Sequence, residues 1–276
     1  MELIKTNATS ASRNLVFTSA GDQSNVRRWL NGHRDFDLWV VYYGEVPESL
    51  YPEADLYVAR AGTKFQNLHY CYSQWRNLFE RYEAVLVMDD DIVIGAGGIS
   101  RLFQIRRTLD LWALQPAFRV AGKISWDITR IRTDARLRYT NFIEMTCPLF
   151  RRDKLDAFMD VFDPELIGYG EDWWFLQTLG GQSRRRVAIA DEVPCINPYD
   201  RVKGGAREID RLSTHEQRKE VWERIKARYG LDEQTRLHEE FGRIDRSRLA
   251  AALTAARFLP EVVYDQAKQA VRRWLT

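Results

Sequence analysis

Three consecutive aspartates, Asp89, Asp90 and Asp91, directly follow an apolar run at residues 84–88 that is rich in Val. Such a run is typical of a strand buried on both faces, and carboxylates at its end would lie where open α/β sheets bind ligands. Three close anions repel one another, and each is costly to desolvate without a partner. The motif therefore predicts Mg²⁺ or Mn²⁺ holding a diphosphate. A simple strand-ending turn would explain one of these acids, but not all three.

A second motif, Gly-Tyr-Gly-Glu-Asp-Trp-Trp, occupies residues 168–174. The glycines allow a tight turn, and Glu171 and Asp172 then fall in the first turn of a helix, where the helix dipole favours acids. Ordinary helix-start chemistry explains the acidic pair alone. Trp173 and Trp174 point further, because sugars stack on aromatic rings and a neighbouring carboxylate can take a proton from a hydroxyl. The alternative is that the tryptophans are core residues, and we expect this of one of them.

The elements that must position these motifs alternate between strands and helices. Strands are expected at residues 14–22, 36–44, 54–61, 84–88, 118–126, 140–150 and 186–196, and helices at residues 64–82, 100–111, 155–162 and from residue 171. This alternation predicts an α/β fold with a mostly parallel central sheet flanked by helices. From about Ala206 the pattern is helical to the end. We therefore expect a core domain at residues 1–205 and a helical C-terminal extension at residues 206–276.

Composition narrows the class of protein. The chain has 276 residues, of which 45% are hydrophobic and 29% charged, as in a globular protein. Its net charge of +2 is too small to predict nucleic-acid binding. Cys71, Cys147 and Cys195 lie far apart, which favours buried thiols over disulfides or a zinc site. With no leader pattern and no apolar run of spanning length, we expect a cytoplasmic protein, with peripheral attachment at the inner face of the membrane as a further option.

The basic tail motivates that option. Residues 201–276 contain 17 Lys and Arg against 12 Asp and Glu, whereas the preceding residues contain 24 against 27. A helix after Pro260 would have an apolar face comprising Val263, Ala267, Ala270, Val271 and Trp274, with Lys268, Arg272 and Arg273 off that face. Basic amphipathic helices of this kind contact anionic membranes or partner helices. The alternative is packing on the protein's own core or on a second copy.

The two acidic motifs together resemble those of glycosyltransferases with the GT-A fold, which use a nucleotide-sugar donor. In these enzymes a D-x-D motif at a strand end holds Mn²⁺ or Mg²⁺ on the diphosphate, and Asp89 and Asp91 match it. A later Glu-Asp motif faces the acceptor, and Glu171 and Asp172 match that one. The Asp of this pair is often the base in inverting families. The resemblance thus implies a GT-A-like catalytic domain.

Four short motifs also resemble, in order, those of a plant and bacterial family described as a domain of unknown function with a GT-A-like core. They are K-F-Q-N-L at residues 64–68, D-D-D at 89–91, Q-P-A at 115–117 and F-I-E-M at 142–145, within a match over about residues 12–205. In this pattern Asn197 replaces a His that GT-A enzymes often use as a third metal ligand. An amide oxygen can also bind Mg²⁺ or Mn²⁺, although imidazole suits Mn²⁺ better.

Four further residues are candidates for ligand contacts. Lys64 begins a helix after a Gly-Thr turn and would reach a phosphate or base, although a solvated Lys is the simpler interpretation. Asp22, after the first strand, would bind ribose or base, or would only cap a turn. Glu144 interrupts an apolar run and needs a partner, either an acceptor or a buried Arg. Trp126 would line the acceptor side, although a plain strand end also explains it.

The sequence thus predicts a metal-dependent, inverting glycosyltransferase of polysaccharide biosynthesis with Asp172 as base and Glu171 orienting the acceptor. Donor contacts are assigned to Asp22, Lys64 and Asp89–Asp91, acceptor contacts to Trp126, Glu144, Trp173 and Trp174, and metal contacts to Asp89, Asp91 and Asn197. The expected partners are a nucleotide-sugar, with a uridine diphosphate donor favoured, and a glycan acceptor. The alternatives are a sugar-phosphate nucleotidyltransferase and a non-catalytic carbohydrate-binding scaffold.

Overall fold

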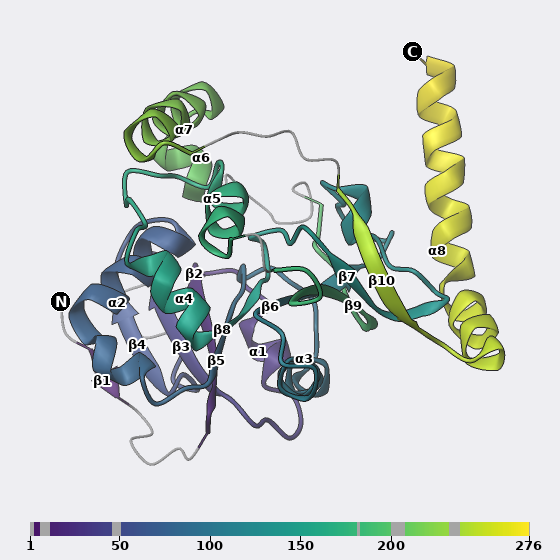
Figure 1. The fold of residues 1–276 in the computed structure, drawn as a ribbon, viewed down its shortest axis with the longest axis horizontal. Helices are drawn as coiled ribbons and strands as arrows, with labels where there is room; N and C mark the ends of the chain where they lie inside the picture. Colours follow the sequence, from purple (N-terminus) through teal and green to yellow (C-terminus); the bar gives the residue numbers. More distant parts are fainter. Residues whose placement is uncertain are drawn as a thin grey trace.

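The centre of the molecule is a ten-stranded sheet with the order β1-β4-β3-β2-β5-β8-β6-β9-β7-β10 (Figure 1). The computed structural model describes residues 3–5, 12–45, 51–180, 183–199, 208–231 and 238–275. The strands are β1 (Ile4–Lys5), β2 (Asn14–Ala20), β3 (Asp37–Tyr42), β4 (Leu56–Ala59), β5 (Ala84–Val87), β6 (Ala113–Phe118), β7 (Ala135–Thr140), β8 (Leu149–Arg151), β9 (Val187–Cys195) and β10 (Glu240–Asp245). Of these described strands, only β1, β8 and β7 run against the others, which confirms the mostly parallel sheet.

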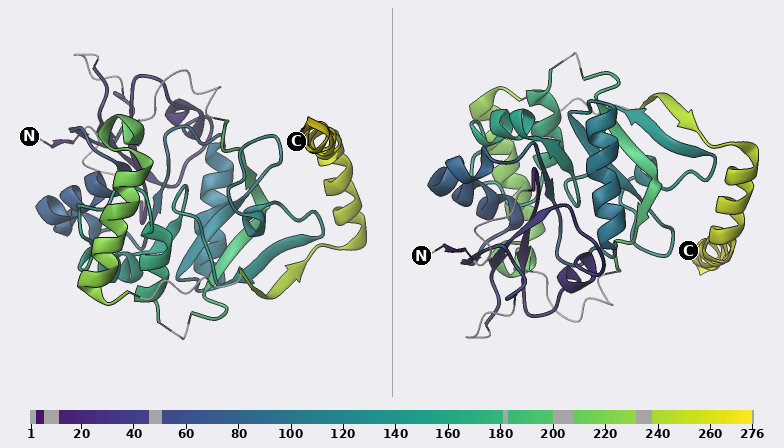
Figure 2. Two further views of the ribbon diagram at one scale, coloured as in Figure 1. Left: turned by 90° about the horizontal axis from the view of Figure 1, so that it is seen from above. Right: turned by 90° about the horizontal axis from the view of Figure 1, so that it is seen from below.

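Helices cover both faces of this sheet, and Figure 2 shows α3 and α7 on opposite sides of it. The helices are α1 (Val26–Trp29), α2 (Lys64–Phe79), α3 (Ala96–Thr108), α4 (Arg152–Met159), α5 (Glu171–Thr178), α6 (Glu208–Leu212), α7 (His215–Tyr229) and α8 (Arg248–Leu275). Strand side chains alternate between two cores: Val16 and Leu86 pack with α1 and α3, and Phe17 and Val85 pack with α2, α4, α5 and α7. This layered arrangement confirms the predicted α/β fold with a central sheet flanked by helices.

Several element boundaries differ from those expected. The helix expected to begin at Ser100 begins at Ala96, with Gly95 as its N-cap, because Ile99 and Phe103 bury its inner face against the sheet. A strand was expected to begin at Phe118, but β6 ends at this residue. Pro116 lies within β6 next to an irregularity in the pairing with β9, where a residue without a backbone donor is tolerated. The strand expected at residues 140–150 is interrupted by a loop at 141–148. This loop contains Glu144.

The C-terminal extension differs from the expected helical appendage. Residues 240–245 form β10, which pairs antiparallel with β7 at the edge of the central sheet. Ile244 of β10 packs against one core, and this gain in buried apolar surface explains why the segment is extended. Trp222 and Ile225 of α7 belong to the other core. Helix α7 and strand β10 are therefore built into the same body as the sheet.

Helix α8 lies at the sheet edge formed by β10, far from α2 and α4 (Figure 1). Within the described residues, no helix has both the length and the apolar character needed to cross a bilayer. Of the predicted apolar face, Val263, Ala267 and Ala270 are exposed. The side chains of Val271 and Trp274 lie outside the described residues. The cysteines are buried and free, as the sequence predicts.

Gly170 couples the extension to the second acidic motif. It is the N-cap of α5, and its φ of 85° is left-handed. A Cβ at this position would lie 2.3 Å from the indole of Trp222 in α7. The turn before Glu171 and Asp172 is therefore braced from behind by the extension, and only glycine fits there.

We expect Gly170→Ala to lower the free energy of unfolding by about 2–5 kcal/mol, because it combines left-handed backbone strain with a clash against Trp222. The matched control is Gly180→Ala, just beyond the other end of the same helix. Gly180 also has a positive φ, but a Cβ added there would meet nothing within 4 Å. This control should lose only about 1–2 kcal/mol. Urea denaturation checks both values, and equal losses would contradict the bracing role of α7.

Candidate functional site

The candidate site lies at the carboxyl edge of the sheet. Asp22 follows β2, Asp89–Asp91 follow β5, and Asn197 lies just beyond β9. These strands run in the same direction, so their carboxyl ends meet at one edge, where open α/β sheets bind ligands. The predicted donor and metal residues are thus brought to one edge of the sheet.

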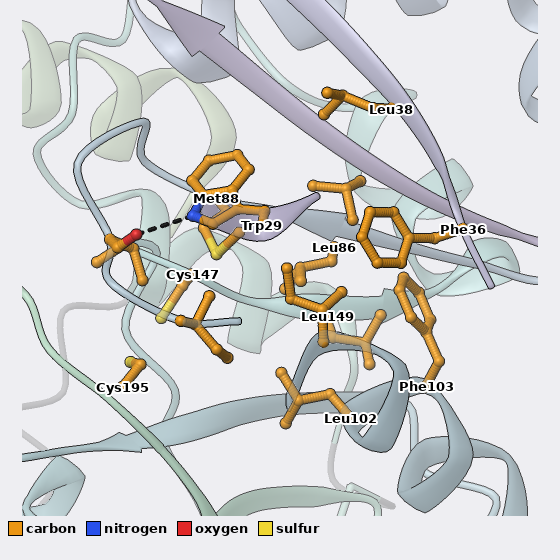
Figure 3. Close-up of a cluster of buried hydrophobic side chains, with 14 of the residues drawn as sticks. Trp29, Phe36, Leu38, Leu86, Met88, Leu102, Phe103, Cys147, Leu149 and Cys195 are labelled. Atoms are coloured by element: carbon orange, nitrogen blue, oxygen red, sulfur yellow. Dashed lines mark hydrogen bonds between the residues drawn. The ribbon is translucent and has the colours of Figure 1, made fainter. Parts of the chain in front are cut away.

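The aspartate triplet is held in a defined turn. The indole nitrogen of Trp29 donates a hydrogen bond of 2.8 Å to the carbonyl of Ile92, drawn as a dashed line in Figure 3. The backbone amide of Asn25 donates to the carbonyl of Asp90 at 2.6 Å. Trp29 is fully buried in the core beneath the turn, so hydrophobic packing and hydrogen bonding together fix the carboxylates.

Asp90 lies on the β2 side of the triplet. Its Oδ2 accepts a 3.0 Å hydrogen bond from the amide of Gly21 and one of 3.3 Å from the Tyr43 hydroxyl. Burial raises the pKa of Asp90 to about 7, and the charges of Asp91 and Asp89 add to the increase, against the lowering effect of the Gly21 amide. A cation or a ligand donor placed here would therefore be strongly attracted by the ionised form.

Lys64 joins the triplet to a second loop. Its Nζ is 2.6 Å from Oδ1 of Asp89, and it donates to the carbonyls of Met145 at 2.6 Å and Thr146 at 3.0 Å. A reciprocal capping box between Thr63 and Gln66 fixes the start of α2 and hence the origin of this side chain. The solvated alternative for Lys64 is wrong, because its side chain is only 10% exposed.

The second acidic motif closes the same network. At the start of α5, Oδ1 of Asp172 accepts a 2.7 Å hydrogen bond from the amide of Met145, and Oε1 of Glu171 accepts one of 3.0 Å from the amide of Gly168. Burial raises the pKa of Asp172 to about 8, with further increases from the charges of Glu144 and Glu171. Burial likewise raises the pKa of Glu171 to about 7. Lys64 opposes both shifts.

Glu144 lies between the two motifs. Its amide donates to Oε1 of Gln115, and its Oε1 accepts a 2.8 Å hydrogen bond from the Thr146 hydroxyl. Its Oε2 is buried and has no hydrogen-bond partner among the described residues. Burial raises the pKa of Glu144, and the charge of Asp89 adds to that effect. Among the described residues, the buried arginine considered from the sequence is not its partner.

Asn197 fits a role beside the triplet. Val93 and Ile196 exchange backbone hydrogen bonds of 2.9 and 3.1 Å. Val93 lies two residues after Asp91 and Ile196 directly precedes Asn197, so this bridge brings the two segments together. Its Oδ1 is buried without a hydrogen-bond partner among the described residues. No group of three or more His, Cys, Asp or Glu in the described part of the chain is arranged to hold a metal ion. Carboxylate and amide oxygens nevertheless suit Mg²⁺ or Mn²⁺ once a diphosphate completes the ligand set.

Asp22 is exposed at the end of β2, where it accepts a hydrogen bond from the Tyr42 hydroxyl. The amide of Glu45 lies 3.5 Å from its other oxygen. It is therefore part of the edge between β2 and β3, adjacent through Gly21 to Asp90. Its predicted contact with a ribose or base stays a prediction.

The tryptophans divide between site and core. Trp126 is 38% exposed, and Trp173 is partly buried beside it around the ring of Phe142. Trp174 is 2% exposed and stacks on Phe162 in the core. Trp174 therefore does not line the acceptor side, because consecutive helix residues point about 100° apart and α5 directs this side chain fully into the core.

Sequence reasoning missed His238 and Phe142. The His238 ring lies 4.2 Å from that of Phe142 and 5.0 Å from that of Trp126. Phe142 occurs in one of the four short motifs, but its apolar type suggested only a strand. His238 lies in a polar segment without a local signal, since its position depends on the pairing of β10 with β7.

Comparisons with known proteins give distant structural neighbours only. Neither a family model nor a curated protein sequence matches this chain, so the plant and bacterial family suggested by the short motifs is not confirmed. Among solved structures, S. aureus TarS residues 1–349 is 14% identical, with a TM-score of 0.45 over 90% of this chain and 71% of that chain. A longer TarS structure gives 14% and 0.48 over 90% and 43%. TarS 1–349 in complex with UDP-GlcNAc gives 12% and 0.46 over 90% and 72%. Such values do not define an activity for this chain.

The raised carboxyl pKa values predict a stability that falls with rising pH. Asp90, Glu171 and Asp172 keep their protons in the folded protein up to about pH 7–8, whereas unfolded carboxyls release them near pH 4. The folded state thus binds more protons over this window, and the melting temperature should decrease from about pH 5 to pH 8. Asp172→Asn should flatten this slope, as measured by differential scanning fluorimetry without added metal.

The control for this measurement is Asp160→Asn. Asp160 lies on the surface beyond α4, and its hydrogen bond with Arg76 lowers its pKa. A carboxyl of this kind loses its stabilising charge only as the pH falls towards its folded pKa, below the tested window. Its removal should leave the slope unchanged, and a slope that responds equally to both variants would contradict the assigned pKa shifts.

Proposed function

We propose that this protein is a metal-dependent, inverting glycosyltransferase that moves a sugar from a nucleotide-diphosphate sugar to a glycan hydroxyl. One observation carries the proposal: the loop at residues 144–146 joins the two acidic motifs. Lys64 links Asp89 to the carbonyls of Met145 and Thr146, and the Met145 amide binds Asp172. Asp89, the proposed diphosphate contact, and Asp172, the proposed base, therefore belong to one network of polar contacts, which supports the proposal.

On the donor side, Asp89, Asp91 and Asn197 would hold Mg²⁺ or Mn²⁺, which would neutralise charge on the leaving diphosphate. Lys64 adds a fixed positive charge next to Asp89. Asp90 and Asp22 line the β2 edge, where hydroxyls of a ribose or polar atoms of a base would find carboxylate acceptors. A uridine diphosphate donor is favoured.

On the acceptor side, Asp172 acts as the base in its ionised form, which becomes populated as the pH approaches its pKa of about 8. It takes the proton of an acceptor hydroxyl while that oxygen forms a bond to the anomeric carbon. The bond from the anomeric carbon to the diphosphate oxygen breaks, and the nucleoside diphosphate leaves with the bonding electrons. Attack from the face opposite the leaving group inverts the anomeric configuration. Glu171 fixes the turn through Gly168, and the unpartnered Oε2 of Glu144 can accept a second acceptor hydroxyl.

Asp172→Asn should reduce turnover by about 10²–10⁴-fold, because it removes a positioned base, while leaving donor affinity nearly unchanged. The Asn can still accept the Met145 hydrogen bond, so the loop should keep its position. Release of nucleoside diphosphate from a UDP-sugar measures turnover, and calorimetry with UDP measures donor affinity. Asp160→Asn is the surface control and should match the wild type.

The same assay separates the alternatives. Near-normal turnover by Asp172→Asn, together with loss of activity in Glu171→Gln or Glu144→Gln, would move the base to another carboxylate. Release of pyrophosphate, rather than nucleoside diphosphate, would identify a nucleotidyltransferase. A protein that binds sugars but releases neither product would be a scaffold.

A further inference from the structure

We propose that the C-terminal extension forms a wall of the acceptor site through His238, and that this wall stacks against a neutral sugar ring. This inference rests on the proposed function, since it names the class of acceptor. Four rings build the wall: Trp126, Phe142, Trp173 and His238. His238 is central, because its ring contacts each of the other three.

The geometry of His238 is that of a packed aromatic residue. Its ring centroid lies 4.2 Å from that of Phe142 and 5.0 Å from that of Trp126. It stacks on Trp173 at 6.1 Å, with an interplanar angle of 22°. Burial lowers the pKa of His238, so the ring is neutral at pH 7. A neutral imidazole offers one donor and one acceptor to sugar hydroxyls and does not repel the apolar face of a sugar.

Specific hydrogen bonds deliver His238 to this position. The amide of Glu239 donates to Oδ1 of Asn141 at 2.9 Å, and the amide of Asn141 donates to the carbonyl of Glu239 at 3.2 Å. Glu240 then pairs with Thr140 at the end of β7. His238 precedes Glu239, and Phe142 follows Asn141. The hydrogen bonds between Glu239 and Asn141 therefore bring the rings of His238 and Phe142 together. The contact is a consequence of sheet register.

The wall lies beside the carboxylates of the acceptor site. Trp173 follows Asp172 directly, and Phe142 precedes Glu144 by two residues. Ser125, next to Trp126, lies close enough to the Glu144 carboxyl to lower its pKa, against the larger effect of burial. The exposed part of Trp126 thus lies near a buried carboxylate oxygen that has no partner in the described residues. Stacking rings beside a hydroxyl acceptor match a pyranose.

The burial of the carboxyls at this site favours a neutral sugar. Burial raises the pKa of Glu144, of Glu171 and of Asp172. The charges of Glu144 and Glu171 raise the pKa of Asp172 further. The burial that disfavours the ionised forms of these carboxyls would equally disfavour the anion of a uronic acid or a phosphorylated sugar at this position. The ligand class is therefore a neutral glycan, with its ring on the aromatic wall and its hydroxyls on Glu144.

The test uses the full chain and a panel of methyl glycosides of glucose, galactose, mannose, N-acetylglucosamine and glucuronic acid. Binding is measured by tryptophan fluorescence, which needs no turnover, and transfer is measured from a UDP-sugar. His238→Ala should weaken binding of the best neutral glycoside, and raise its KM, by about 3- to 10-fold, the scale of one aromatic contact. His238→Phe should stay within about 2-fold, and His33→Ala, an exposed histidine, is the control.

Hydrolysis of the UDP-sugar without acceptor should be the same in all these variants, because His238 does not contact the donor residues. Unchanged glycoside affinity in His238→Ala, preference for the glucuronide, or no binding of any neutral glycoside by the wild type would overturn the wall. If the wild type binds neutral glycosides but does not hydrolyse the UDP-sugar, the proposed transferase function is contradicted, whereas the proposed sugar-binding wall is not.

A separate observation assigns a second surface: we infer that the outer face of α8 rests on an anionic membrane surface. Leu249, Leu253, Leu259, Val263 and Tyr264 are between 55% and 71% exposed. They are the five most exposed large hydrophobic side chains in the part of the chain that the structure describes. So many exposed apolar residues on one helix indicate an interaction surface.

The charges of α8 distinguish the occupant. Its only acids, Glu261 and Asp265, face the body of the protein, where they pair with Arg119 and Arg130 at 3.3 Å. Phe258 is buried on the same side. In the described part of α8, the exposed ionic residues are Arg248 and Arg257, and both are cationic. A second copy of α8 would oppose cation to cation, whereas anionic headgroups would complement the arginines around an apolar face.

Vesicle flotation tests this surface with phosphatidylcholine alone and with added phosphatidylglycerol. The wild type should float only with the anionic lipid, and less in high salt. Leu253→Glu and Val263→Glu should each reduce the bound fraction at least about 5-fold, since they place an anion in the apolar face. Val161→Glu, at an exposed apolar position near α4, should match the wild type. Absence of flotation, or a solution dimer that Leu253→Glu dissociates, would overturn the membrane assignment.

Discussion

The ammonium group of Lys64 is the interaction on which the candidate site depends. It holds Asp89 and two carbonyls of the 144–146 loop, and its charge opposes the raised pKa values of Glu171 and Asp172. One buried cation nevertheless cannot balance so many carboxylates. Burial raises the pKa values of Asp90 and Glu171 to about 7 and that of Asp172 to about 8, which favours their protonated forms in the folded chain alone. A divalent cation and its ligand would complete this charge arrangement.

The C-terminal extension is part of this arrangement. Trp222 of α7 packs on Gly170 and supports the turn before the acidic pair, and β10 adds to the sheet and carries His238 to the aromatic wall. The same segment then leads into α8, whose outer face is apolar. The proposed base, the proposed acceptor wall and the proposed membrane surface thus each depend on an element of the C-terminal extension, namely α7, β10 and α8.

Sequence patterns predicted the parts of this site that have local causes. The buried strand before Asp89–Asp91 and the glycine turn before Glu171 form as expected, because Val-rich runs and Gly-containing turns determine their own backbone. The loop around Glu144 was predicted as a strand because its sequence is largely apolar. In the described part of the structure these apolar residues are buried, but they do not pair with another strand. His238 and the core position of Trp174 depend on tertiary packing, which single-sequence periodicity does not encode.

Isothermal titration calorimetry of UDP, with Mn²⁺ and with chelator, tests the central claim that the carboxyl edge is a metal-assisted nucleotide-diphosphate site. We expect UDP to bind well only with Mn²⁺, and Mn²⁺ alone to bind poorly, because the protein supplies few oxygen ligands of its own. Asp91→Ala should abolish the metal-dependent part, whereas Asn197→His should tighten Mn²⁺ binding. UDP binding that is tight with chelator present and unchanged in Asp91→Ala would contradict the metal site and the proposed mechanism with it.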